Sequence, residues 1–130
     1  MYAEGLKENR IGTQIVDATM AVHSGMGPGL LESAYEFCLA HELVKRGVRV
    51  RNQVYVPIRY DGIVIENSYR LDLLVEDLVI VELKSVETIL PVHRGQVRSY
   101  LRLGGFRLGY LLNFNVAHIR DGITRLANNL

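Results

Sequence analysis

The chain has little of several features that would fix its class at once. Its 130 residues include one cysteine, Cys38, so an internal disulfide and a cysteine-rich zinc site are excluded. Tryptophan is absent, and no apolar run approaches the length of a membrane-spanning helix. The first ten residues are polar and lack the apolar core of a secretory signal. We therefore expect a cytoplasmic protein without a membrane partner.

The chain also lacks a charge excess. Its 15 basic and 14 acidic residues give a net charge of +1, a balance that does not by itself indicate a nucleic-acid-binding protein. Hydrophobic residues make up 48% of the sequence, and 130 residues suit one domain with one core. We expect a single domain over residues 1–130, in which residues 1–10 form a flexible or loosely packed N-terminal segment.

The apolar period changes along the chain. Helical spacing covers about 11–23 and about 30–46, and the glycine-rich run at 24–29 separates the two segments. A period of two then predicts strands near 48–58, 63–74 and 78–85. A helix that follows Pro91, a strand over 107–113 and a short terminal strand or hairpin over 116–126 complete the order.

This order predicts an α/β fold. Two helices come before the strands and one comes between the third and fourth strands, which favours a three-layer sandwich with a central mixed β-sheet flanked by helices. The helix between the third and fourth strands should make a right-handed crossover between parallel neighbours.

The segment YRLDLLVEDLVIVELK at 69–84 carries charges where a buried hairpin should have none. Asp72 lies in its first strand, and Glu82 and Lys84 lie in its second. Strand side chains alternate between faces, so Glu82 and Lys84 point the same way. Two carboxylates beside a lysine can bind a divalent cation and activate a water. The alternative is a salt bridge on a solvated face of the sheet.

The loop of this hairpin decides whether its two carboxylates can meet. A two-residue turn at Glu76-Asp77 would place Asp72 opposite Val81 and direct it away from the face of Glu82. A shared site therefore requires a loop of odd length or a bulge.

A wider set of residues resembles a known family. The run Gly29-Leu30-Leu31-Glu32-Ser33-Ala34-Tyr35 fits the pattern that names the GxxExxY protein family. The arrangement of Asp72 and Glu82-Leu83-Lys84 resembles the core of the PD-(D/E)xK nuclease superfamily, to which that family is assigned. The resemblance runs from about residue 11 to 125 and includes Pro91-Val92-His93, Gln96, Ser99-Tyr100-Leu101 and Leu112-Asn113-Phe114-Asn115.

The resemblance implies a restriction-endonuclease-like core and a metal-dependent phosphodiesterase site. Asp72 and Glu82 would bind Mg²⁺ or Mn²⁺, with the backbone carbonyl of Leu83 as a further ligand. Lys84 would orient or deprotonate the attacking water. Glu32 would complete the acidic cluster directly or through water, and the resemblance also favours a catalytic role for Gln96.

The helix after Pro91 carries two polar faces. His93, Gln96 and Tyr100 share one face, and three arginines at four-residue steps form a second face that suits a phosphate backbone. These residues (Arg94, Arg98 and Arg102) are called the arginine stripe below. The alternatives are a solvated helix face for the arginines and, for Gln96 and Tyr100, polar tips packed between helix and sheet.

Two functions remain open from the sequence. The first is a metal-dependent nuclease that acts on DNA or RNA. The second is a non-catalytic nucleic-acid-binding or protein-interaction module that keeps a nuclease-like fold. A chain of this size has little surface to hold a duplex, so a homodimer is one arrangement that would supply more.

Overall fold

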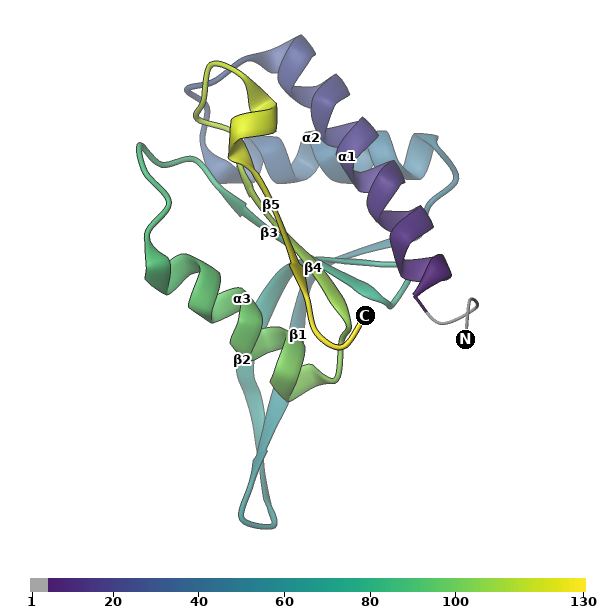
Figure 1. Ribbon diagram of the computed structural model, residues 1–130, viewed down its shortest axis with the longest axis vertical. Coiled ribbons are helices and arrows are strands. Elements are labelled where there is room, and N and C mark those ends of the chain that lie inside the picture. Colours follow the sequence, from purple (N-terminus) through teal and green to yellow (C-terminus); the bar gives the residue numbers. More distant parts are fainter. Residues whose placement is uncertain (1–4) are drawn as a thin grey trace.

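The computed structural model describes residues 5–130, which form one five-stranded sheet and three α-helices (Figure 1). The strands, in their order across the sheet, are β1 (Val50–Tyr60), β2 (Ile63–Val75), β3 (Val79–Lys84), β4 (Leu108–Asn113) and β5 (Ile123–Ala127). Strands β3 and β4 are parallel, and the other neighbouring strands are antiparallel. The predicted α/β fold with a mixed sheet is confirmed.

The helices cover both faces of the sheet. Helices α1 (Leu6–Met26) and α2 (Glu32–Lys45) share one core with the sheet, in which Ile15 and Leu39 pack with Val81. Helix α3 (Pro91–Gly104) connects β3 to β4 and shares a second core, in which Leu101 packs with Ile80. Because successive residues of β3 point to opposite faces, one apolar strand supplies both cores. The result is the predicted three-layer arrangement.

The N-terminal helix begins earlier than the apolar pattern indicates. Residues 6–10, which we expected to be loosely packed, are the first turns of α1, and Glu8 is buried there. The same expectation for residues 1–4 lies outside the described residues. No helix within residues 5–130 is long and apolar enough to cross a membrane.

The loop between β2 and β3 has three residues, not two. Val75 pairs with Val79, and the residues between them are Glu76, Asp77 and Leu78. Glu76 and Asp77 both have positive φ, at 53° and 56°. A contact with the residue before β1 stabilises this bend, because the Glu76 carboxylate accepts a hydrogen bond of 2.7 Å from the Arg49 N–H. The loop has the odd length that a shared carboxylate site requires.

The end of the chain is one strand rather than a hairpin. A short 3₁₀ helix over Ile119–Gly122 precedes the single strand β5, so the first of the two expected forms is confirmed. Gly122 lies so close to the Asn113 carbonyl that a Cβ at this position would overlap the oxygen, so the tight turn requires a glycine here. β5 then pairs with β4 at the far edge of the sheet.

Candidate active site

The candidate site lies where β2 and β3 separate. Their ladder runs from Val75–Val79 to Leu73–Val81 and ends there, after which β2 continues with β1 alone in a long ribbon (Figure 1). Asp72 and Glu82 are the next residue on each strand. The Asp72 N–H donates to Glu82 Oε1 at 3.0 Å, and the Leu83 N–H donates to Asp72 Oδ2 at 2.9 Å. The two carboxylates therefore bond to backbone N–H groups beyond the end of the ladder, and they lie side by side.

The β1–β2 ribbon changes the face that it covers at this point. Leu71 belongs to the core under α3, whereas Leu73 belongs to the core under α1 and α2. Residues two apart in a regular strand would share one face. Asp72 lies between them, and Gln53, its counterpart on β1, has a positive φ of 53°. The change of face places Asp72 at the boundary between the two helical layers, where α2 and α3 can both supply side chains.

The environment of the two carboxyls disfavours their ionised forms. Glu82 is 6% exposed, and burial, followed by the charge of Asp72, raises its pKa to about 8. Burial also raises the pKa of Asp72, and the nearby charges of Glu36 and Glu32 act in the same direction. The Leu83 N–H opposes this rise because it donates to the charged form of Asp72. The buried position of Glu82 argues against the alternative of a salt bridge on a solvated face.

Lys84 does not neutralise this pair. Its charge favours ionisation of both Asp72 and Glu82, but no ion pair within 4.0 Å joins Lys84 to either carboxylate in the described part of the chain. Lys84 is half-buried and follows Glu82 by two residues on β3, so the two side chains share a face. The site thus holds two adjacent carboxyls whose charges repel and no cation paired with them.

This donor set fits a hard divalent cation. Mg²⁺ takes one or two protein carboxylates and keeps several waters, and a bound cation would remove the repulsion between Asp72 and Glu82. Within residues 5–130, no three His, Cys, Asp or Glu side chains gather closely enough to hold an ion as they stand. Glu32 is exposed at the start of α2, near enough to raise the pKa of Asp72 but outside a closed set of ligands. Leu83, the expected carbonyl ligand, is buried and gives its N–H to Asp72.

The residues of the GxxExxY pattern set the position of Glu32. The buried hydroxyl of Tyr35 donates to the Gly27 carbonyl at 2.5 Å and accepts from the Leu30 N–H at 3.1 Å. The Ser85 hydroxyl donates to the Leu30 carbonyl at 2.6 Å. The loop before α2 is therefore fixed to its own helix and to the residue after Lys84, which keeps Glu32 beside the end of β3.

Helix α3 brings a tyrosine and a glutamine to the other side of the carboxyls. Burial raises the pKa of the Tyr100 hydroxyl, and the charges of Glu82 and Asp72 raise it further. Gln96, which is exposed on α3, acts in the opposite direction and lowers this pKa. Tyr100 also stacks on Tyr69 with ring centroids 4.4 Å apart, so its ring is fixed by packing between helix and sheet.

The remaining residues expected on α3 lie at its surface. His93 Nδ1 accepts the Leu90 N–H at 3.0 Å, so this side chain caps the first turn of the helix. Arg98 and Arg102 are exposed and Arg94 is half-buried. None of the three residues of the arginine stripe forms an ion pair within the described residues, so their charges are available to an external anion.

Sequence reasoning missed Glu36 and Gln53 near the site and gave no separate role to Asn113, which lies in the segment that resembles the family. Glu36, one turn after Glu32, and Gln53 on β1 share a hydrogen bond of 2.6 Å. Asn113 is buried, and its amide bonds to both the N–H and the carbonyl of Val86, which holds the chain just beyond Lys84. A buried amide at the end of an apolar strand is the signal that could have identified Asn113.

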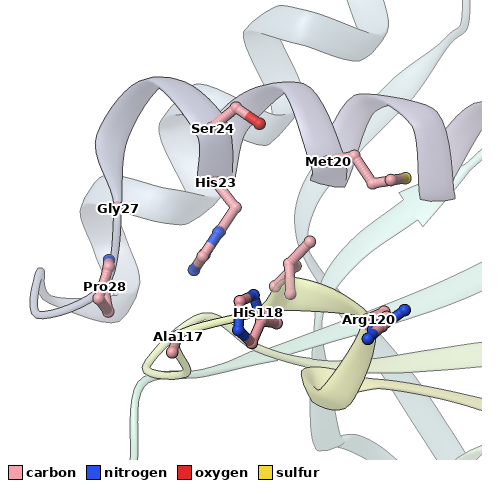
Figure 2. A pocket seen from close by; sticks show the side chains of 9 residues that line it. Met20, His23, Ser24, Gly27, Pro28, Ala117, His118 and Arg120 are labelled. Atoms are coloured by element: carbon pink, nitrogen blue, oxygen red, sulfur yellow. The ribbon is translucent and has the colours of Figure 1, made fainter.

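Two surface hollows do not include the carboxyls of the site. One, of about 550 Å³, runs along α3 and is lined by Val92, His93, Gly95, Gln96 and Ser99. The other, of about 490 Å³, lies between the end of α1 and residues 117–120 (Figure 2). His23 projects between these two segments and its Nε2 bonds to the Val116 carbonyl at 2.8 Å, so this histidine fastens them together. The first hollow is the one that borders Gln96.

Comparison with known proteins agrees with this geometry. No curated protein and no solved structure gives a significant match to the chain. The family model of the PD-(D/E)XK nuclease superfamily matches residues 9–126, which include most or all of every strand and of the three α-helices. The chain belongs to the PD-(D/E)XK nuclease superfamily.

Proposed function

We propose that this protein is a metal-dependent nuclease that hydrolyses phosphodiester bonds in DNA or RNA, and that it belongs to the GxxExxY branch of its superfamily. The observation that carries the proposal is the adjacent pair Asp72 and Glu82, with Lys84 two residues further along the same strand. The neighbouring negative charges favour a divalent cation, and the half-buried lysine can act beside it.

Each residue of the site has a chemical task in this proposal. Asp72 and Glu82 hold Mg²⁺ or Mn²⁺, Glu32 supports the ion directly or through water, and the Leu83 carbonyl is a further ligand. The bound ion supplies a more acidic water and stabilises charge on the phosphate. Lys84 orients the attacking water and places a positive charge beside the phosphate. Gln96, whose side chain affects the pKa of Tyr100, would act beside that hydroxyl at the same centre.

The substrate would lie along α3. The arginine stripe offers three cations to a phosphate backbone, and such contacts position a nucleic acid without reading its sequence. His93, Gln96 and Tyr100 would contact the strand that enters the site. The hollow beside Gln96, with Gly95 in its wall, leaves space for that approach.

The test compares cleavage with metal binding. Single- and double-stranded DNA and RNA are incubated with Mg²⁺, Mn²⁺ or EDTA, with the wild type, Lys84→Ala and Asp72→Ala. Lys7→Ala is the matched control, because it removes an exposed lysine on α1. We expect cleavage by the wild type and by the control in the presence of metal, and by neither site variant.

Thermal melts of the same proteins separate the two site residues. Mn²⁺ should raise the Tm of the wild type and of Lys84→Ala but not that of Asp72→Ala, because the lysine acts on water and phosphate whereas Asp72 holds the ion. A wild type that neither binds metal nor cleaves any of the four substrates would instead favour the non-catalytic interaction module.

A further inference from the structure

Gln53 has an unusual backbone conformation at the same level as the two carboxyls. Its φ is 53°, which is uncommon for a residue other than glycine. It lies between the pairs Asn52–Leu73 and Val54–Leu71, so its counterpart on β2 is Asp72, whose own counterpart on β3 is Glu82. Three neighbouring strands therefore each place one polar residue in a single row across the sheet.

The amide of Gln53 holds a third carboxylate beside this row. Gln53 Nε2 donates to Glu36 Oε1 at 2.6 Å, and Asn52 Nδ2 donates to Glu36 Oε2 at 3.3 Å. Both oxygens of Glu36 are thus fixed by amides from β1. Glu36 follows Glu32 by one helical turn, so the two carboxylates lie on the same side of α2.

The oxygen of the same amide has no partner. Within residues 5–130, Gln53 Oε1 is the one buried side-chain oxygen or nitrogen without a hydrogen bond. Reversing the amide would place this oxygen against the Glu36 carboxylate, so the hydrogen bond to Glu36 fixes its orientation. Buried acceptors are nearly always paired, and an acceptor without a donor at a functional site indicates a missing water or ion.

We propose that Gln53 and Glu36 form an outer layer of the metal site, in which Gln53 Oε1 accepts a hydrogen bond from a water in the shell of the cation at Asp72 and Glu82. Glu36, fixed by Gln53 and Asn52, adds negative charge beside that shell. Gln53 is a positioning residue in this arrangement. The proposal rests on the metal-dependent function above and extends it to two residues that the sequence pattern did not identify. In other metalloproteins, residues of this kind orient the metal ligands, and replacing one commonly lowers metal affinity by about 10–100-fold.

The competing explanation is that Gln53 only shapes the bend in β1. Gln53→Gly separates the two roles, because glycine accepts a positive φ without strain but has no amide. Asn67→Gly is the matched control, since Asn67 is an exposed residue of the same ribbon with a φ of 52°. Mn²⁺ affinity of the metal-free proteins is measured by titration calorimetry, and their stability is measured by thermal melts without metal.

We expect Gln53→Gly to fold and to bind Mn²⁺ about 10–100-fold more weakly than the wild type. Asn67→Gly should keep wild-type affinity. Wild-type affinity in folded Gln53→Gly would overturn the role of Gln53 and leave the nuclease proposal intact. If Gln53→Gly fails to fold, Glu36→Gln decides, and unchanged Mn²⁺ affinity in that variant overturns the outer layer. A wild type without Mn²⁺ affinity overturns this inference together with the metal-dependent function.

Discussion

Replacing Glu82 by glutamine should stabilise the metal-free protein, and the gain should depend on pH. Burial and the charge of Asp72 raise the pKa of Glu82 from 4.5 to about 8. Below pH 4.5 the carboxyl is protonated in both the folded and the unfolded chain. Between pH 4.5 and about 8 it ionises only in the unfolded chain, so the free energy of unfolding of the wild type falls as pH rises. Above that range the loss is complete.

The size of this effect follows from the interval between the two pKa values. Each pH unit between 4.5 and about 8 corresponds to about 1.4 kcal/mol, which gives on the order of 5 kcal/mol for the whole interval. The glutamine side chain of the Glu82→Gln variant is neutral at every pH, and its oxygen can still accept the Asp72 N–H. The free-energy difference between this variant and the wild type should therefore increase by several kcal/mol between about pH 5 and about pH 8.5.

The assay is urea denaturation of both proteins in EDTA at intervals from about pH 4.5 to about pH 8.5, followed by circular dichroism. Comparing the two proteins at each pH removes the contribution of the shared titrating groups that do not interact with Glu82, and Asp72 contributes to the difference through its repulsion with Glu82. A difference that stays constant across this range would refute the account of Glu82 as a buried carboxyl with a raised pKa. Adding Mn²⁺ at about pH 8 should stabilise the wild type and not the variant, because the cation offsets the charge that the variant lacks.

Two further predictions concern the fold and the substrate surface. Gly95→Ala should stabilise the protein by about 1 kcal/mol, since Gly95 is helical with open space around it. Gly122→Ala should destabilise the protein by about 2 kcal/mol, because the added Cβ would overlap the Asn113 carbonyl. Thermal melts that rank the two variants in the reverse order would contradict this packing. Replacing the arginine stripe by three glutamines should weaken nucleic-acid binding, measured by fluorescence anisotropy. The slope of the logarithm of the binding constant against the logarithm of the salt concentration should become less steep by about 2–3. An unchanged slope would assign the stripe to a solvated face.

The order of the elements could be predicted because local patterns determine it. The change from helical spacing to a period of two marks the boundary before β1, and Pro91 marks the start of α3. The proximity of Asp72 and Glu82 could be predicted only conditionally, from strand parity and the length of a loop. That length depends on a contact between Glu76 and the backbone of Arg49, which lies 27 residues earlier in the chain.

The outer residues of the site could not be found from local patterns. Gln53 occupies an ordinary position in an alternating strand, and nothing in its neighbours announces a positive φ. Glu36 resembles any charged residue on the surface of a helix until β1 places two amides against it. The 3₁₀ turn before β5 likewise depends on the approach of Gly122 to Asn113, a contact between segments that the sequence does not reveal.

The most direct test of the account is the anomalous X-ray scattering of a crystal soaked in Mn²⁺. We expect one strong peak within ligand distance of both Asp72 and Glu82, with Glu32 bound directly or through one water and a further water hydrogen-bonded to Gln53. A peak distant from Asp72 and Glu82, or no peak while both carboxylates keep their bonds to the backbone N–H groups, would contradict it.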